Sequence, residues 1–184
     1  MITTTTKRVA PLWIACSIAF CGIATAQTTA PATHNPNAPV PVVAAAVGGD
    51  AQFVTSASTA NATEIIASRL ASTQAQSPKV KAFAATMIQD HTAANDKLRT
   101  IAQKNGFALA STAMVEQQPD LAKLQNLNGK DFDTAYTAMM NKDHQDAVAL
   151  FTSESTKGSN AELKAFATQT LPALQHHLEM AKAL

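Results

Sequence analysis

Cysteine is scarce in this chain of 184 residues: Cys16 and Cys21 are the only two. Both lie in a segment that resembles a secretory signal, with two basic residues, an apolar run and the small-residue end Ala24-Thr25-Ala26. We therefore predict a signal peptide over residues 1–26, cleavage after Ala26 and export to the periplasm. The mature chain would then have no disulfide to form, and its stability would come from packing.

The two cysteines raise the alternative of a lipoprotein signal. Phe20 is too large for the position before a lipidated Cys21, and Cys16 comes too early in the apolar run. We expect no lipid anchor.

An excess of charge of either sign is also missing, with 14 Lys and Arg against 13 Asp and Glu. The chain contains no basic block, so nucleic acid and anionic lipid are poor candidate partners. After the signal, no apolar run approaches the ~20 residues that a membrane-spanning helix needs. Phosphate-binding glycine loops, serine nucleophile motifs and Cys-His pairs are absent as well, and we predict no catalytic residue.

Residues 27–47 contain no charged side chain and little that could be buried. Proline recurs there among Thr, Ala and Asn. Such a composition predicts a disordered or polyproline-like linker that could act as a spacer. The folded domain is expected over residues 48–184.

Four long helices are predicted in that domain. The first runs from an Asp50 N-cap to about residue 76, and Ser77-Pro78 opens the second, which ends at Asn105-Gly106. The third covers about 131–157. A Ser159-Asn160-Ala161-Glu162 capping box opens the fourth.

The connection over residues 107–129 determines the topology. An up-down-up-down bundle needs only short loops, whereas this connection is long enough to cross a bundle whose helices are ~40 Å long. Leucines after Pro119 indicate one short helix inside it. We predict an all-α, ferritin-like four-helix bundle with a long crossover between the second and third long helices.

Each long helix carries one ionisable residue within its apolar stripe. These residues are Glu64, His91, His144 and His177. The first three lie ~20 Å along their helices and His177 lies ~26 Å along, so the four can form one polar layer near the middle of the bundle.

Three hypotheses explain this layer. A hydrogen-bonded Glu–His network could fix helix register, because a buried charge needs a partner. Alternatively, Glu64, His91, His144 and His177 could bind one transition-metal ion such as zinc, copper, iron or nickel. Acid–base catalysis without a metal is the third.

Two further pairs of residues accompany the histidines. Asp90 and Asp143 each precede a histidine by one residue, which predicts solvent-facing or second-shell positions rather than metal ligands. Met87 and Met140 each precede a histidine by one turn. Their sulfur atoms would suit cuprous copper, although methionine at this spacing is also ordinary core.

Four stretches of the sequence resemble a bacterial family of exported proteins that carry domain of unknown function 4142. They are Phe53-Val54-x-x-Ala57, Met87 to Asn95, Gly129 to Tyr136 and Leu171 to Leu178. The resemblance covers about residues 48–184 and implies a ferritin-like four-helix bundle.

The di-iron ferritin-like proteins are similar at the level of fold only. They carry a Glu three residues before the metal-binding His, whereas this chain has Ile88, Asn141 and Leu174 at those positions. Iron chemistry of the ferritin kind is therefore not predicted.

Two functional hypotheses follow from the sequence. The chain is an exported helical bundle that binds one transition-metal ion, or it is a structural or interaction protein of the cell envelope. A redox enzyme of the peroxide-scavenging or oxidase kind is a third and weaker hypothesis, since it would require a bound redox metal.

Overall fold

The computed structural model describes residues 49–184, and the predicted signal peptide and linker lie outside these residues. The described part is helical. Its helices are α1 (Gly49–Gln74), α2 (Pro78–Asn105), α3 (Thr112–Glu116), α4 (Pro119–Gln125), α5 (Gly129–Lys157) and α6 (Ala161–Lys182).

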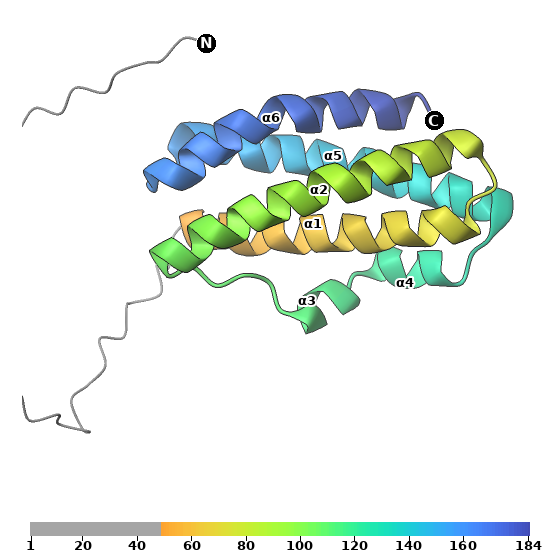
Figure 1. Cartoon of the computed structure of the whole chain (residues 1–184), viewed down its shortest axis with the longest axis horizontal. Helices are drawn as coiled ribbons and strands as arrows, with labels where there is room; N and C mark the ends of the chain where they lie inside the picture. Colours follow the sequence, from red (N-terminus) through yellow and green to blue (C-terminus); the bar gives the residue numbers. More distant parts are fainter. Residues whose placement is uncertain (1–48) are drawn as a thin grey trace, which may run out of the picture. The chain divides into compact units, whose positions relative to one another are not determined.

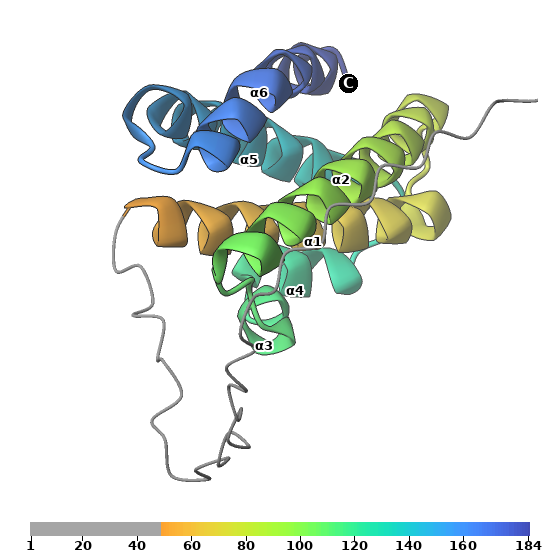
Figure 2. The same ribbon diagram turned by 60° about the vertical axis from the view of Figure 1, so that its left-hand side comes forward.

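The four long helices form two antiparallel hairpins, α1–α2 and α5–α6, which lie side by side (Figures 1 and 2). Helix α1 packs on α5, and α2 packs on α6. The short helices α3 and α4 run along α1 on its outer side.

The predicted crossover is confirmed. The Thr55 hydroxyl near the start of α1 contacts the Ala108 carbonyl oxygen at 3.4 Å, and the Gln74 amide at the end of α1 donates to the Leu127 carbonyl at 2.9 Å. The connection thus travels the length of α1, and α5 starts at the end of the bundle where α2 starts. It contains two short helices where the sequence indicated one.

The boundaries of α2 agree with the sequence signals. Ser77 is its N-cap, with the side-chain oxygen accepting from the Val80 amide. Gly106 follows its last residue with a φ of 74°, in the left-handed region that glycine adopts without steric cost.

The predicted role of Asp50 is wrong. Helix α1 already includes Gly49, and the Asp50 carboxylate instead accepts from the backbone amides of Ser159 and Asn160, at 2.9 and 2.8 Å. These hydrogen bonds join the start of α1 to the α5–α6 turn. They depend on tertiary packing, which local sequence signals cannot predict.

The start of α6 also differs from the prediction. Asn160, not Ser159, is the N-cap, and its side-chain oxygen accepts from the amides of Glu162 and Leu163, both at 3.0 Å. Asparagine is as good an N-cap as serine, and the Ser159 amide is engaged by Asp50.

Two apolar clusters fill the core. The first gathers near the α1–α2 turn and includes Met87, Phe132 and Tyr136. The second gathers near the opposite end and includes Phe53, Leu98 and Leu163. The buried Glu64, His91, His144 and His177 lie between the two clusters.

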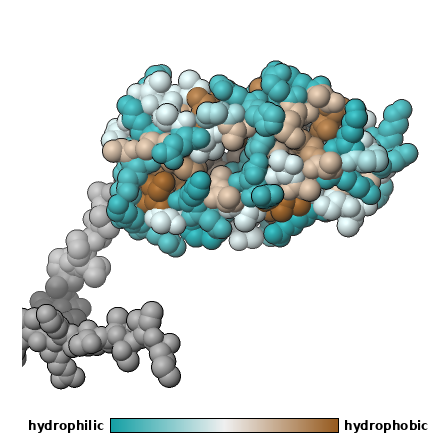
Figure 3. Space-filling view, turned by 45° about the horizontal axis from the view of Figure 1, so that its top comes forward, coloured by the Kyte–Doolittle hydropathy of each residue, from teal (hydrophilic) through white to brown (hydrophobic). Residues whose placement is uncertain are grey.

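The surface of the described residues is mostly polar. On the face shown in Figure 3, apolar residues occur in small spots among hydrophilic ones. Met114 in α3 is the one large hydrophobic side chain recorded as exposed in residues 49–184. None of the helices in this part of the chain is both long and apolar enough to span a membrane.

Candidate metal centre

The structure brings together the four ionisable residues singled out from the sequence. Glu64 comes from α1, His91 from α2, His144 from α5 and His177 from α6. Their exposed fractions are only 1%, 3%, 0% and 3%. Such burial is costly for polar side chains unless each has a hydrogen-bonding or charged partner. Their contacts therefore distinguish a hydrogen-bonded network from a metal site.

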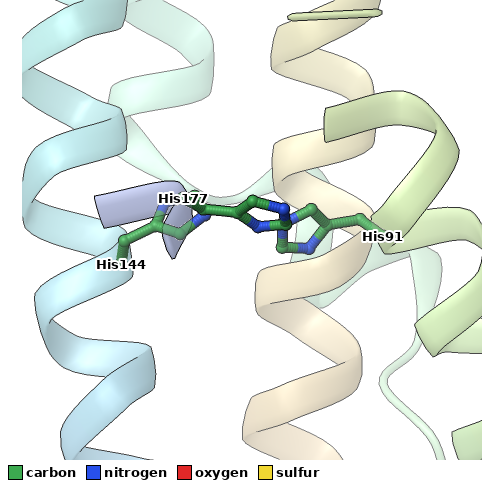
Figure 4. A group of neighbouring side chains, drawn as sticks. All are labelled: His91, His144 and His177. Carbon is green, nitrogen blue, oxygen red and sulfur yellow. The ribbon is translucent and has the colours of Figure 1, made fainter. Parts of the chain in front are cut away.

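The three imidazoles form a compact triangle. The ring centroids of His91, His144 and His177 are 5.5 Å apart in all three pairs. One nitrogen of each ring lies within 4.8 Å of the corresponding nitrogens of the other two. Figure 4 shows the rings converging from three helices. We call these residues the three-histidine group.

The outer nitrogen of His91 has two acceptors from α1. Its Nδ1 lies 2.8 Å from Glu64 Oε2 and 2.9 Å from Asn61 Oδ1. A carboxylate and an amide oxygen both accept, so Nδ1 carries the proton. Nε2 of neutral His91 is then left with a free lone pair.

The other two histidines repeat this pattern with different partners. His144 Nδ1 donates to the Met140 backbone carbonyl at 2.9 Å, with Glu64 Oε1 at 3.8 Å. His177 Nε2 donates to Asp90 Oδ2 at 3.0 Å. Each ring is therefore fixed in one tautomer by an acceptor behind it.

The inner nitrogens have no such partner. His91 Nε2, His144 Nε2 and His177 Nδ1 are buried and make no hydrogen bond within the described residues. A histidine that ligates a metal almost always donates its other ring N–H to a carboxylate or carbonyl oxygen, which fixes the ring and raises its basicity. The three-histidine group shows this arrangement three times.

The protonation states favour lone pairs on two of the rings. Burial lowers the pKa of His144 and His177, so both are neutral near pH 7. Burial also opposes a charge on His91, but the adjacent Glu64 carboxylate outweighs it and raises the His91 pKa. The same pairing lowers the Glu64 pKa against the effect of burial.

Glu64 therefore lies behind the histidines. Its carboxylate contacts the Nδ1 atoms of His91 and His144, which are their outer nitrogens. Within the described residues, the side chains close enough together to share one metal ion are the three histidines.

The remaining residues singled out from the sequence occupy different positions. Asp90 contacts His177 rather than its own neighbour His91. Asp143 makes no contact with the three-histidine group. Burial, followed by the charge of Glu64, raises its pKa to about 7. Met87 and Met140 are buried in the first apolar cluster.

Asn61 was missed from the sequence. It is buried, with 5% of its surface exposed, and its side-chain oxygen contacts His91. The signal available was its place three residues before Glu64, on the same face of α1. Its side-chain nitrogen, Nδ2, is buried and has no hydrogen-bond partner in the part of the chain that the structure describes.

A cleft between α2 and α6 borders two residues of the three-histidine group. Its volume is about 300 Å³, and Asn61, His91 and His177 are among the residues that line it. Asp90, which holds His177, also lines it, so the cleft borders the outer side of these two histidines. We call this space the α2–α6 cleft.

Comparison with known proteins places this chain in a family. Residues 35–184 match the model of the domain of unknown function DUF4142, and the chain belongs to that family. A sequence comparison with curated proteins gives no match.

Several solved structures share the fold. A DUF305 fragment from Deinococcus radiodurans has a TM-score of 0.64 at 15% identity, over 76% of this chain and 96% of that one. A DUF305 protein from Streptomyces coelicolor scores 0.62 at 14% identity, over 73% and 90%. CopM in its Cu(II)-bound form scores 0.62 at 19% identity, over 73% and 93%. At these identities the likeness shows the fold alone.

Proposed function

We propose that this protein is an exported metal-binding bundle that holds one transition-metal ion with His91, His144 and His177. One observation carries the proposal: each of the three imidazoles has a buried inner nitrogen without a partner among residues 49–184 and an outer nitrogen hydrogen-bonded to an oxygen. A network that served only to fix helix register would pair these inner nitrogens instead.

The distances fit the proposal after a small adjustment. An ion bound ~2.1 Å from each nitrogen would hold the nitrogens roughly 3.4 Å apart in tetrahedral geometry. One ring nitrogen of each histidine lies within 4.8 Å of a ring nitrogen of each of the other two. Rotation of the imidazole rings about their side-chain bonds would have to close this difference.

Glu64 is assigned a supporting role. Its carboxylate holds the Nδ1 proton of His91 and compensates charge at the centre. This assignment replaces the sequence-based hypothesis that Glu64 is a ligand, and it leaves three imidazoles as the donor set.

Imidazole donors suit copper, zinc, iron and nickel. Copper is the first metal to test, since CopM, a protein of similar fold, was solved with Cu(II) bound. The single buried carboxylate of the layer does not supply the carboxylate set of a di-iron centre.

The experiment is elemental analysis of untagged mature protein after exposure to copper, zinc or iron and removal of free metal. Wild type is expected to retain about one equivalent of a single metal. The variant His91→Ala/His144→Ala is expected to retain none. His176→Ala is the matched control, because His176 is the exposed neighbour of His177.

Retention of metal by the double variant, or a wild type that stays metal-free with all three metals, would contradict the proposal. The second result would favour a structural bundle of the cell envelope in which the polar layer sets helix register.

A further inference from the structure

Two carboxyl groups meet at the end of the bundle that contains the α5–α6 turn. Asp50 belongs to the first turn of α1, and Glu154 belongs to the last turn of α5. Both line a space of about 330 Å³ beside Gly158 and Ser159 of the α5–α6 turn. Figure 1 shows the start of α1 and this turn at the same end of the bundle. The two acidic side chains therefore share one small region.

The Asp50 carboxylate holds the α5–α6 turn. One of its oxygens accepts from the Ser159 amide at 2.9 Å, and the other accepts from the Asn160 amide at 2.8 Å. Both oxygens thus act as acceptors, so a proton shared by the two carboxyl groups belongs to Glu154.

Glu154 is buried directly beneath the turn. Only 5% of its surface is exposed, and its Oε1 has no hydrogen-bond partner within residues 49–184. Its backbone carbonyl accepts from the Gly158 amide at 2.8 Å, and a β-carbon placed on Gly158 would lie 2.5 Å from Glu154 Oε1. The turn therefore packs against the Glu154 carboxyl, and glycine leaves the room for it.

A negative charge on Glu154 is unfavourable in this position. Burial, followed by the charge of Asp50 and a hydrogen bond to Asp50, raises the pKa of Glu154 to about 7. Lys164 of α6 opposes this increase, and Lys157 of α5 also lines the space. Both lysines are exposed, so water and salt screen their charges.

We propose that Glu154 and Asp50 form a proton-dependent latch between α5 and α1. A proton on Glu154 allows its carboxyl group to donate to Asp50, which keeps the start of α1 against the α5–α6 turn. Loss of this proton leaves two adjacent carboxylates, whose repulsion loosens the contact.

The direction of the pH effect follows from the position of this proton. The folded bundle retains it up to about pH 7, whereas an ordinary glutamate loses it near pH 4.5. The stabilisation is therefore complete below about pH 4.5 and is lost as the pH rises to about 7. The latch closes in acid and weakens at neutral and alkaline pH.

Glu154→Gln tests the role of the proton. The glutamine keeps the shape of the side chain, and its amide can donate to Asp50 at every pH. Urea denaturation of the metal-free mature protein compares this variant with wild type at pH 5 and pH 8. The comparison cancels the other groups that titrate in this range.

We expect the unfolding equilibrium constant of wild type to rise at least about tenfold more between these pH values than that of Glu154→Gln, since one pKa unit corresponds to a factor of ten. Glu116→Gln, which alters an exposed carboxylate of α3, is the control and should follow wild type.

Hydrogen exchange locates the effect. The Ser159 and Asn160 amides, which Asp50 accepts, should lose protection between pH 5 and pH 8 in wild type, after correction for the intrinsic exchange rate. In Glu154→Gln their protection should stay constant.

Equal pH dependence of stability in wild type and Glu154→Gln would overturn the inference. An NMR titration of the Glu154 carboxyl carbon in wild type provides a test that needs no variant, and a midpoint near the 4.5 of an ordinary glutamate would also overturn it. Neither result bears on the proposed metal centre, because the experiments use metal-free protein.

Discussion

The bundle consists of two halves, the α1–α2 hairpin and the α5–α6 hairpin, that face each other across the polar layer. An aspartate from each half holds the turn of the other. Asp50 accepts from the amides of the α5–α6 turn, and Asp133 accepts from the Gln76 and Ser77 amides of the α1–α2 turn, at 3.1 and 2.8 Å.

Other paired features have the same spacing in sequence as these two aspartates. The N-caps Ser77 and Asn160 correspond in this way, and so do the buried aromatics Phe83 and Phe166. The two hairpins therefore share one framework of caps, turn contacts and core aromatics.

The polar layer does not follow this framework. At the same spacing, Glu64 corresponds to Ala147 and His91 to Leu174. The first half contributes a carboxylate and one imidazole, and the second half contributes two imidazoles. The repeated residues are those that hold the fold together, whereas the residues that differ form the candidate metal centre.

Glu64 is one of the residues in which the two halves differ, because the second half has Ala147 at the corresponding position. Its replacement by alanine should have the largest effect of the variants described here. In Glu64→Ala, metal affinity should fall about 10- to 100-fold, because the orienting partner of His91 is lost. The metal-free protein should lose roughly 3 kcal/mol of its free energy of unfolding, because the His91 ring keeps no charged partner.

Metal titration and urea denaturation measure these two effects. Glu179→Ala, which alters an exposed carboxylate of α6, is the control. An affinity equal to that of wild type would show that Glu64 does not orient His91.

The two turn contacts should be of similar strength. Asp50→Ala and Asp133→Ala should each lower the free energy of unfolding by about 1–3 kcal/mol, the range for hydrogen bonds to a charged group. Urea denaturation of metal-free protein checks this. A large effect in one variant and none in the other would show that the halves are not held together equivalently.

Asp143 offers a smaller test that depends on pH. It corresponds to Ala60 in the other half, and burial, followed by the charge of Glu64, raises its pKa from the 3.8 of an ordinary aspartate to about 7. The folded state therefore resists losing this proton, and stability is lost as pH rises between these values.

Asp143→Asn should remove this penalty. The variant should be more stable than wild type by about 1–2 kcal/mol at pH 8, after allowance for solvent screening, with a difference near zero at pH 4. Asp146→Asn, on an exposed site of α5, is the control. A gain that is the same at both pH values would contradict the assigned pKa.

Much of the fold was predictable because its signals are local. Ser77-Pro78 and Gly106 mark the ends of α2, and the length of the connection after Gly106 indicates the crossover. The apolar spacing around His91 placed it in the core without knowledge of any other helix.

The details of the centre were not predictable, because they depend on how helices rotate against one another. Spacing brings Glu64 and His91 into one layer, but it does not say which nitrogen of His91 faces Glu64. The contact of Asp90 with His177 and the role of Asp50 at the α5–α6 turn arise in the same way, between residues distant in sequence.

The central claim is that one ion sits among the inner nitrogens of three histidines. A crystal structure of copper-loaded protein, with anomalous scattering recorded at the copper edge, tests it most directly. We predict one anomalous peak ~2 Å from His91 Nε2, His144 Nε2 and His177 Nδ1. A peak bound to the Glu64 carboxylate, or peaks only at exposed sites such as His176, would contradict this account.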